Sequence, residues 1–327
     1  MKFESIDALY MSAYPAFALL AAIRLDLFSA LAQGAGDAEQ IAARLKVAPG
    51  RLAPLLQALV VAGVVEKSGE RYSNGAEADR MLVKGRPDFL EGIGELYLDR
   101  YRAALGAEQS IRDDRPSAKK DFASMKPQEA AAYYAGMFKR AVDAGVELAG
   151  RFDFASCRSL LDAGGGSGGV AAGLCRVLPE LNVTVADLPP VLPIARTRIA
   201  ESGLAGRVRV LEADVLAAPP PGAYDAAVVR SLLQVMSVPD AGRALANIVA
   251  AVKPGGPVYV LGRVLDDSGL SPEECVFYNV VFINLYQDGR AYPERQYREW
   301  FRGAGIGGVQ RISLAGGHSI VWGRKQG

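Results

Sequence analysis

The chain has 327 residues, half of them apolar, which is more than one hydrophobic core usually organises and excludes a disordered or low-complexity protein. Its 37 Lys and Arg nearly balance its 36 Asp and Glu, so charge does not favour a nucleic-acid or anionic-membrane partner. The single histidine, His318, and three scattered cysteines predict no metal site. We expect Cys157, Cys175 and Cys275 to be buried thiols in a reducing, cytoplasmic compartment.

Residues 1–90 predict a small domain of helices with one hairpin. A strongly apolar helix covers residues 17–31, and Asp37 followed by Gln40 has the spacing of a capping box that opens the next helix. A third helix covers residues 51–63, and the segment VVEKSGERYS after it predicts a strand, a turn and a strand. Three helices and a β-ribbon form a winged helix.

Two kinds of partner are disfavoured by this first domain. A DNA-reading helix needs side chains that reach phosphates and base edges, but residues 51–63 offer only Arg51 and Gln57 among apolar residues. The apolar stretch nearer the start is interrupted by Arg24 and Asp26, which leaves it short of a membrane span. A helix that is apolar on nearly every side belongs in a core or an interface, so we expect packing or dimerisation.

The rest of the chain predicts a helical linker and an α/β domain. Residues 91–154 have a helical pattern with charged faces, interrupted by the polar loop 112–121. From residue 155 to 327, strands alternate with helices; the strands are SLLDA, NVTVAD, RVRVLEAD, YDAAVVR, PVYVLG and SIVWGR. This alternation predicts a doubly wound, mostly parallel sheet of the Rossmann-like kind.

A glycine-rich turn follows the first of these strands. Gly164, Gly166 and Gly169 satisfy G-x-G-x-x-G directly after a strand and at the start of a helix. Residues without a Cβ allow the tight turn and let a ligand approach the backbone. Asp187 ends the next strand, roughly 20 residues further on, where a carboxylate can accept hydrogen bonds from ribose hydroxyls. The pattern predicts a ligand that contains a nucleoside.

Acidic residues decide between two nucleoside ligands. Asp162, just before the glycines, would repel the pyrophosphate of a dinucleotide but attract the ammonium and sulfonium groups of S-adenosylmethionine. Asp214 ends the third strand and could accept from an adenine amino group, although it could also be a helix cap or a loop acid. We therefore expect S-adenosylmethionine, with an NAD-dependent enzyme as the weaker alternative.

The motifs SLLDAGGGSGG, NVTVADLPPVL, RVRVLEADVL and VKPGG closely resemble the dimeric S-adenosylmethionine-dependent O-methyltransferases of the caffeate and acetylserotonin type. The segment from Ile23 to Glu66 resembles the winged-helix dimerisation domain of that family, and YYAGM (133–137) resembles its pocket-lining helix. The resemblance implies a class I methyltransferase fold and a homodimer. It also implies a small-molecule acceptor of secondary metabolism and S-adenosyl-L-homocysteine as product.

The resemblance also implies roles for individual residues around the cofactor. Gly164 and Gly166 would hold the methionine moiety, and Asp187 would hold the ribose. Arg230 stands where the family usually has a lysine near the carboxylate of the cofactor. The full predicted cofactor set is Asp162, Gly164, Gly166, Asp187, Leu188, Asp214, Val215 and Arg230, in which Asp214 and Val215 flank the adenine.

The sequence departs from the family at the catalytic base. The family usually has a His-Asp-Trp triplet whose histidine is the general base, and here its place is taken by Gln234, Val235 and Met236. The glutamate that orients this base is replaced by Ala291. Gln234 can position a substrate through hydrogen bonds but has no useful proton affinity. We therefore expect methyl transfer by proximity and orientation to an acidic hydroxyl.

Three alternatives remain open: a cofactor-binding enzyme that hydroxylates, decarboxylates or rearranges its substrate, an N- or C-methyltransferase, and a winged-helix regulator. Further candidate catalytic residues come from the pocket segments. Tyr134 could hold a water or take a proton, although Tyr133, Tyr134, Tyr278 and Tyr286 equally suit an aromatic pocket lining. Asn279 and Asn284 interrupt an apolar helix, either as substrate hydrogen-bonders or as structural amides. We expect His318 to be structural and away from the pocket.

Overall fold

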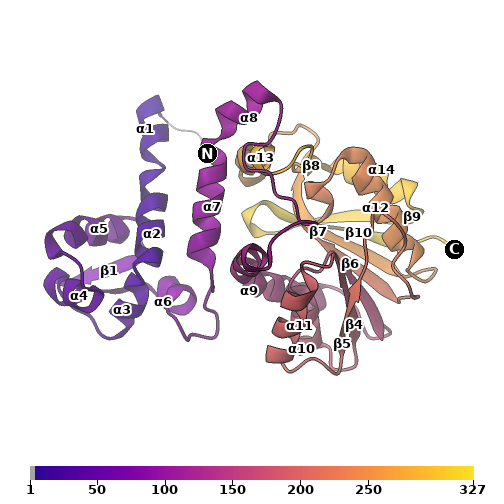
Figure 1. The fold of residues 1–327 in the computed structure, drawn as a ribbon, viewed down its shortest axis with the longest axis horizontal. Coiled ribbons are helices and arrows are strands. Elements are labelled where there is room, and N and C mark those ends of the chain that lie inside the picture. The colour runs from indigo at the N-terminus through magenta and orange to yellow at the C-terminus, as the bar shows by residue number, and fades with distance from the viewer. Residues whose placement is uncertain (1–3) are drawn as a thin grey trace. The chain divides into compact units, whose positions relative to one another are not determined.

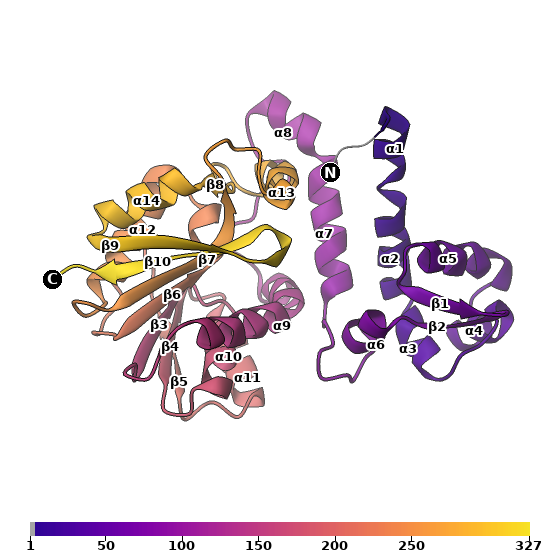
Figure 2. The same cartoon turned by 180° about the vertical axis from the view of Figure 1, so that it is seen from behind.

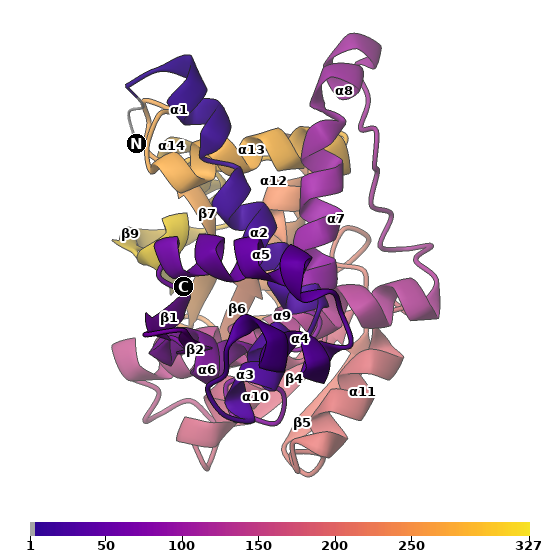
Figure 3. The ribbon, with the colours of Figure 1, turned by 90° about the vertical axis from the view of Figure 1, so that its left-hand side faces the viewer.

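A computed structural model describes residues 4–327, and the chain divides into two units, Met1–Leu98 and Asp99–Gly327. The first unit contains a group of helices and a β-ribbon (Figure 3). Its elements are α1 (Ile6–Met11), α2 (Tyr14–Arg24), α3 (Leu27–Ala32), α4 (Ala38–Leu45), α5 (Pro49–Val61), β1 (Val65–Ser68), β2 (Arg71–Asn74) and α6 (Ala76–Leu82). The boundary between the units falls inside α7 (Ile93–Leu105).

The predicted capping box is confirmed at the start of α4, and one predicted helix is corrected. The Gln40 amide N–H donates to Asp37 Oδ1 at 2.9 Å, while Gln40 Oε1 accepts from the Asp37 N–H at 3.3 Å. The single apolar helix expected over residues 17–31 is two helices. Asp26 adopts a left-handed backbone with φ of 58° and separates α2 from α3. A local break of this kind leaves the apolar pattern intact, so periodicity alone does not reveal it.

One face of α5 is buried and the other is exposed. Leu52, Leu56 and Leu59, at helical spacing, pack into the core of the first unit with Phe28. Val61 at the end of the helix is 91% exposed. The sequence predicts that α5 is buried on nearly every side, but within a single chain only one face of α5 is buried.

The second unit is built on a mixed sheet with the order β5-β4-β3-β6-β7-β10-β9, and β8 pairs with β7. Its strands are β3 (Ser159–Ala163), β4 (Asn182–Asp187), β5 (Val208–Glu212), β6 (Ala226–Arg230), β7 (Pro257–Leu265), β8 (Tyr292–Pro293), β9 (Ile306–Ser313) and β10 (His318–Lys325). The strands from β5 to β7 are parallel, and β10 and β9 add an antiparallel edge beside β7 (Figure 2). The predicted mostly parallel, doubly wound sheet is confirmed.

Helices cover both faces of this sheet (Figure 1). One face carries α9 (Pro127–Arg151), α10 (Gly169–Val177) and α11 (Leu192–Glu201), and the other carries α12 (Val238–Ala250) and α14 (Glu294–Gly303). Successive side chains of a strand point to opposite faces, so Leu160 of β3 packs with α9 and α10 while Leu161 packs with α12. The remaining elements are α8 (Ala107–Asp113), α13 (Glu273–Leu285) and two short 3₁₀ turns, η1 (Leu233–Val235) and η2 (Ala315–Gly317).

Glycines let α9 approach α10 closely. A Cβ at Gly173 would collide with the carbonyl oxygen of Val142, and one at Gly145 would collide with that of Val170. A Cβ at Gly169 would lie 2.6 Å from that of Ala141. The third glycine of the motif therefore serves helix packing, and this packing positions the first half of α9 beside the glycine turn.

Candidate active site

The glycine turn between β3 and α10 has a left-handed backbone. Gly164 and Gly166 have φ of 65° and 59°, a region that L side chains rarely adopt. A Cβ at Gly166 would lie 2.7 Å from Cε1 of Tyr134, and one at Gly164 would lie 2.8 Å from Cδ2 of Leu232. The turn therefore needs glycine for its backbone conformation and because two side chains cover it closely.

The register of the sheet brings the predicted cofactor residues to one edge. β3 lies between β4 and β6, and its last residue pairs with Ala186 on one side and Val229 on the other. Gly164, Asp187 and Arg230 each come directly after one of these paired residues, so they lie side by side at the carboxyl ends of three strands. Strand order reverses at β3, and ligands of open α/β sheets bind at such a switch point.

Asp187 ties the glycine turn to the end of β4. Its Oδ2 accepts from the Gly166 N–H at 2.7 Å, and its Oδ1 accepts from the Leu188 N–H at 2.7 Å. Burial raises the pKa of Asp187, and these two hydrogen bonds oppose the rise. Each carboxylate oxygen keeps a lone pair, so the group can still accept from the hydroxyls of a ligand.

Asp162 is a fully buried carboxyl group, with none of its surface exposed. Among residues 4–327, neither of its carboxylate oxygens has a hydrogen-bond partner of good geometry. Burial raises its pKa to about 7; the backbone amide of Ala171 opposes the rise, Asp187 adds to it, and Arg230 opposes it. Buried polar groups in native proteins are almost always paired, so a carboxyl without a well-formed hydrogen bond among residues 4–327 is suited to accept a cationic group of a ligand.

Arg230 ends β6 on the same face of the sheet, toward α9. Burial lowers the pKa of its guanidinium, and the nearby carboxyl of Asp162 opposes that effect. Among residues 4–327, no hydrogen bond or ion pair holds the side chain of Arg230. Two opposite charges, Asp162 and Arg230, thus influence each other without forming a direct pair. This arrangement suits a ligand that has both an ammonium and a carboxylate group.

Asp214 matches its predicted alternative more closely than its predicted role. Its side chain is exposed, and its Oδ1 accepts from the Leu216 N–H at 2.8 Å, so it caps the turn after β5. Val215 beside it is buried, and its carbonyl accepts from Nδ2 of Asn247 at 2.8 Å. The second oxygen of Asp214 is the group that stays available for an adenine amino group.

Gln234, at the position of the family's histidine, lies in η1 with 8% of its surface exposed. Its Oε1 accepts from the backbone N–H of Arg263 on β7 at 2.8 Å. A Cβ at Gly262 would lie 2.8 Å from this oxygen, so glycine is needed there for the close approach. The carboxamide oxygen is committed to the sheet, and the Nε2 hydrogens are the part of Gln234 that can reach a substrate.

The two asparagines of α13 differ, and one prediction is corrected. Asn284 is fully buried; its Oδ1 accepts from the hydroxyls of Ser110 and Ser117 at 2.6 and 3.1 Å, and its Nδ2 donates to the Val280 carbonyl at 2.6 Å. Asn284 is therefore a structural amide and is not a substrate ligand. Asn279 uses only part of its amide, because its Oδ1 accepts from the Ala291 N–H at 2.8 Å while its Nδ2 has no partner among residues 4–327.

Tyr134 belongs to an aromatic cluster that the sequence placed only approximately. Its ring covers Gly166, and burial raises its pKa with a further contribution from Asp187, so the phenol stays protonated at neutral pH. The ring of Tyr133 lies 5.2 Å from that of Tyr134 at an edge-to-face angle of 84°. We call the following residues the aromatic cluster: Phe122, Tyr133, Tyr134, Tyr278, Phe282 and Tyr286.

Sequence reasoning missed Arg100, whose guanidinium lies against this cluster. Its Nη2 donates to the Tyr133 hydroxyl at 3.2 Å, and its Cζ lies 5.3 Å from the centre of the Tyr133 ring. Only 11% of the side chain is exposed, and Nε is buried without a hydrogen-bond partner. Arg100 lies in a helix with several other charged residues, so no spacing rule distinguishes it.

His318 is nearer to the site than the sequence predicts. It pairs with Arg263 across β10 and β7, near the carboxyl end of β7. Burial lowers the pKa of its imidazole to about 4, and the positive charges of Arg263 and Arg230 add to the effect. At neutral pH this histidine is uncharged and a weak proton acceptor.

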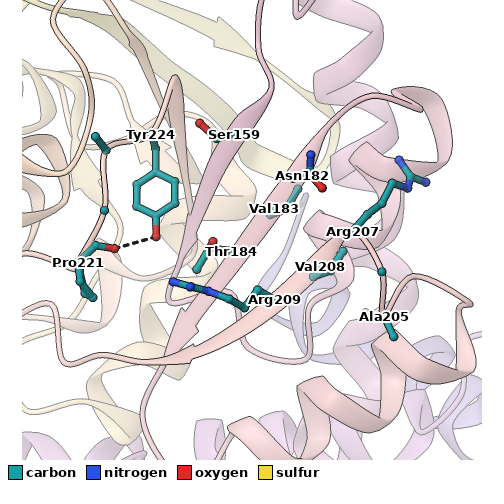
Figure 4. Close-up of a pocket in the computed structure, with 13 residues that line it drawn as sticks. Ser159, Asn182, Val183, Thr184, Ala205, Arg207, Val208, Arg209, Pro221 and Tyr224 are labelled. Carbon is teal, nitrogen blue, oxygen red and sulfur yellow. Dashed lines mark hydrogen bonds between the residues drawn. The ribbon is translucent and has the colours of Figure 1, made fainter.

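The cysteines and a surface hollow of the second unit lie away from the glycine turn. Cys157, Cys175 and Cys275 are free and buried, as predicted. A hollow at the amino ends of β3, β4 and β5 lies at the opposite edge of the sheet from the glycine turn, where the Tyr224 hydroxyl donates to the Pro221 carbonyl (Figure 4). Within residues 4–327, no group of three or more metal-ligating side chains gathers.

Family models match both parts of the chain. A model described as the O-methyltransferase domain matches residues 118–307, and one described as the O-methyltransferase dimerisation domain matches residues 6–84. The chain is 32% identical to 3-hydroxy-5-methyl-1-naphthoate 3-O-methyltransferase of Streptomyces sahachiroi, over 94% of this chain and 91% of that protein. It is 29% identical to the tetracenomycin polyketide synthesis 8-O-methyl transferase TcmO of Streptomyces glaucescens, over 97% and 95% of the two chains.

Two further similarities concern the fold and the reaction. The structure of human N-acetylserotonin methyltransferase in complex with SAM has a TM-score of 0.86 with 18% identity, and covers all of both chains. This likeness shows the fold. The chain is also 30% identical to the aclacinomycin 10-hydroxylase RdmB of Streptomyces purpurascens, over 75% of this chain and 69% of that protein. Similar sequences therefore include one named for a reaction other than methyl transfer.

Proposed function

Because the chain belongs to the O-methyltransferase family, we propose that it methylates an acidic hydroxyl of an aromatic small molecule in secondary metabolism, with S-adenosylmethionine as donor. When bound, S-adenosylmethionine supplies an electrophilic methyl group on a sulfonium. The named relatives act on a hydroxynaphthoate and in tetracenomycin synthesis, which supports a ring-bearing hydroxyl as the acceptor group.

The residues present fit this cofactor. The Asp162 carboxylate has no hydrogen-bond partner among residues 4–327, which supports a place for an ammonium group. The Arg230 guanidinium near it supports a place for a carboxylate. Gly164 and Gly166 would let the amino-acid portion approach the backbone, and Asp187 with Leu188 would accept and flank the ribose. Asp214 and Val215 remain the proposed neighbours of the adenine.

The observation that carries the mechanism is the hydrogen bond from the Arg263 N–H to Gln234 Oε1. An amide whose oxygen is bound to the sheet can donate from Nε2 but cannot accept a proton, so Gln234 would orient the acceptor. Tyr134 stays protonated and His318 is a weak base, so neither replaces the missing histidine. The chain would therefore act by holding the acceptor oxygen in line.

Energetics then constrain the acceptor. Ionising a phenol with an ordinary pKa near 10 at pH 7 costs about 4 kcal/mol. A positioned general base usually raises the reaction rate by ~10²–10⁴-fold. Positioning of reactants contributes ~7–11 kcal/mol without any proton transfer. An acceptor whose hydroxyl is already acidic needs only the second contribution, so we expect an acceptor with an acidic hydroxyl.

The test measures methyl transfer from labelled S-adenosylmethionine, at saturating cofactor, to acceptors whose hydroxyl pKa values differ. We expect the midpoint of the pH–rate profile to follow the pKa of each acceptor. A single midpoint near neutrality for all acceptors would show that an enzyme group acts as base. Gln234→Ala is the matched variant: it should lower the rate and leave the midpoints unchanged. Analysis of the product separates O- from N- and C-methylation.

A second candidate function is supported by the missing base and by the hydroxylase among the relatives. In that case the cofactor would be bound and the methyl group retained. The two candidates differ in where the label goes. Label that appears in the acceptor supports methyl transfer, whereas label that stays in the cofactor while the acceptor gains oxygen or loses carbon dioxide supports the alternative.

We propose that the chain works as a homodimer in the cytoplasm. Contrary to the expectation from the sequence, residues 6–24 are long and apolar enough to span a membrane, with a mean hydropathy of 1.5. However, α1 and α2 within them are separate helices, and the dimerisation model covers the segment. Large apolar side chains are exposed there, namely Ile6, Leu9, Tyr10, Met11, Tyr14 and Phe17. A partner subunit is the cover that we propose for them. Light scattering without detergent should give twice the mass of 34.7 kDa.

The three-part division of the chain stays part of this proposal. Residues 1–90 would form the dimerisation part, residues 91–154 the linker and pocket helices, and residues 155–327 the part that binds the cofactor. The long α9 and the loop before it support this division, because they carry Phe122, Tyr133 and Tyr134 of the aromatic cluster.

A further inference from the structure

We infer that Arg100 binds a carboxylate of the acceptor, at the end of the molecule remote from the hydroxyl that is methylated. This inference rests on the proposed function and narrows its acceptor to an aromatic hydroxy acid. It follows from the contacts of one guanidinium group, from the rings around that group, and from its separation from the glycine turn.

The guanidinium of Arg100 presents its bidentate edge to the aromatic cluster. Nε and Nη2 form the fork that matches the two oxygens of a carboxylate. Nη2 donates to the Tyr133 hydroxyl at 3.2 Å, and Nε has no partner within the described residues. Buried donors are normally satisfied, so an unpaired Nε–H in this place indicates a missing acceptor atom.

The opposite edge of the same group is already engaged. Nη1 of Arg100 lies 3.4 Å from Oδ2 of Asp99. Asp99 is shared with Lys120 at 3.3 Å, and Lys120 also lies 3.4 Å from Glu129. Asp99 therefore holds one end of the guanidinium from a partly exposed position, while no carboxylate of residues 4–327 pairs with Nε or Nη2. These linked ion pairs orient the Arg100 guanidinium and leave its Nε and Nη2 edge available for a ligand.

The side chains around the Nε and Nη2 edge of Arg100 suit a flat, anionic ligand. Tyr133, Tyr278 and Tyr286 are close enough to act on Arg100 electrostatically; burial by itself lowers the pKa of Arg100, and these tyrosines outweigh it. Phe122 stacks on Tyr286 with ring centres 6.3 Å apart and an interplanar angle of 26°. Aromatic faces contact ring systems favourably, and hydroxyl groups donate to anionic oxygens.

Two aromatic rings separate Arg100 from the glycine turn. Tyr134 covers Gly166, Tyr133 packs edge-to-face on Tyr134, and Arg100 lies beyond Tyr133. Since this series of contacts places two rings between Arg100 and the turn, we expect Arg100 to contact a group of the acceptor other than the hydroxyl held for reaction. An acidic group across a fused ring system would span this separation, which distinguishes a remote carboxylate from the ionised hydroxyl itself.

The test compares two probes by isothermal titration calorimetry on the full chain loaded with S-adenosylhomocysteine. The probes are 3-hydroxy-1-naphthoate and 3-hydroxy-1-naphthamide, which share the hydroxyl and differ in charge. We expect the naphthoate to bind about 10- to 100-fold more tightly, the range for one charged hydrogen-bonded contact. Arg100→Gln should abolish this preference, and Arg100→Lys should keep part of it. Arg102→Gln, an exposed change on the same helix, should leave it intact.

Several outcomes would overturn the inference. The parent protein could bind neither probe, or it could bind both equally. The Arg100→Gln variant could keep the preference for the naphthoate over the naphthamide. Equal binding that strengthens with pH would assign the contact to the ionised hydroxyl instead. Titration of S-adenosylhomocysteine alone reports the fold and the proposed cofactor site separately, so its failure is distinguishable. If Arg100→Gln fails that control, Tyr133→Phe decides: a preference reduced a few-fold supports the inference, and an unchanged one refutes it.

Discussion

Replacing Asp162 by asparagine should stabilise the chain relative to the parent as pH rises, and weaken cofactor binding. The carboxyl is fully buried, and burial raises its pKa from 3.8 to about 7. Because the pKa is higher in the folded chain, the protonated carboxyl adds to the free energy of unfolding. This contribution is fully present below the pKa of the unfolded chain and is lost as pH rises through about 7. At about 1.4 kcal/mol per pH unit, the ionised form costs about 4 kcal/mol in the folded chain.

The assay is urea unfolding of the cofactor-free chain at about pH 5.5 and at about pH 8. Roughly half of the cost is already present at the lower pH, because the unfolded carboxyl is ionised there while the folded one is protonated. The parent should therefore lose about 2 kcal/mol more than Asp162→Asn between the two conditions. S-adenosylhomocysteine should bind the variant about 10-fold or more weakly, since a charge opposite the ammonium is lost.

Asp225 provides a matched control at the other edge of the sheet. It accepts from the backbone N–H groups of Arg158 and Ser159 at 2.9 Å and from Lys253 Nζ at 2.6 Å. Burial raises the pKa of Asp225, but these contacts together outweigh burial and lower it. Asp225→Asn should destabilise the chain at pH 8 and leave cofactor affinity unchanged. If Asp162→Asn behaves like this control, or shows the same stability difference at both pH values, the reasoning about Asp162 is refuted.

Three smaller changes test the neighbouring parts of the site. Tyr134→Phe should keep cofactor affinity and turnover, because the hydroxyl is not a base, whereas Tyr134→Ala should weaken cofactor binding several-fold in calorimetry by uncovering the turn. Asn284→Ala should cost about 2–4 kcal/mol in urea unfolding, because Ser110 and Ser117 lose their shared acceptor, with an unchanged preference among acceptors. Gly166→Ala should reduce cofactor affinity at least 10-fold, since a Cβ there meets the Tyr134 ring in a left-handed backbone.

Much of the fold follows from local patterns. The capping box of α4, the glycine turn and the strand–helix alternation are short-range features, and each one is confirmed. The break at Asp26 and the strand β9 are not, because a left-handed residue leaves hydrophobic spacing intact and Gly307 and Gly308 weaken the pattern of a strand. β9 forms because β10 provides a ladder for it, which is a tertiary effect.

In the candidate site, too, the sequence predicts the residues that lie near a motif but not those that depend on distant partners. Asp162 and Asp187 lie next to a motif, so sequence alone predicts that they meet. The role of Asn284 depends on Ser110, 174 residues earlier, and no spacing rule connects the two. The role of Arg100 also depends on distant residues, because the aromatic rings around it come from α9 and the region of α13. Residues that act through distant partners need the folded chain to reveal them.

The missing base cannot be restored by a single substitution at Gln234, and this gives a final prediction. A neutral imidazole has one acceptor nitrogen, and in Gln234→His the N–H of Arg263 would occupy it, leaving only a donor toward the acceptor. A carboxylate to reorient the ring, as in Ala291→Glu, would be buried at a site that is 1% exposed and whose N–H is bound to Asn279. Turnover of a phenol with an ordinary pKa should therefore not rise in Gln234→His, measured against an acidic acceptor as control. A rise of about 100-fold, the effect of a working base, would contradict the view that packing around β7 commits this enzyme to acidic acceptors.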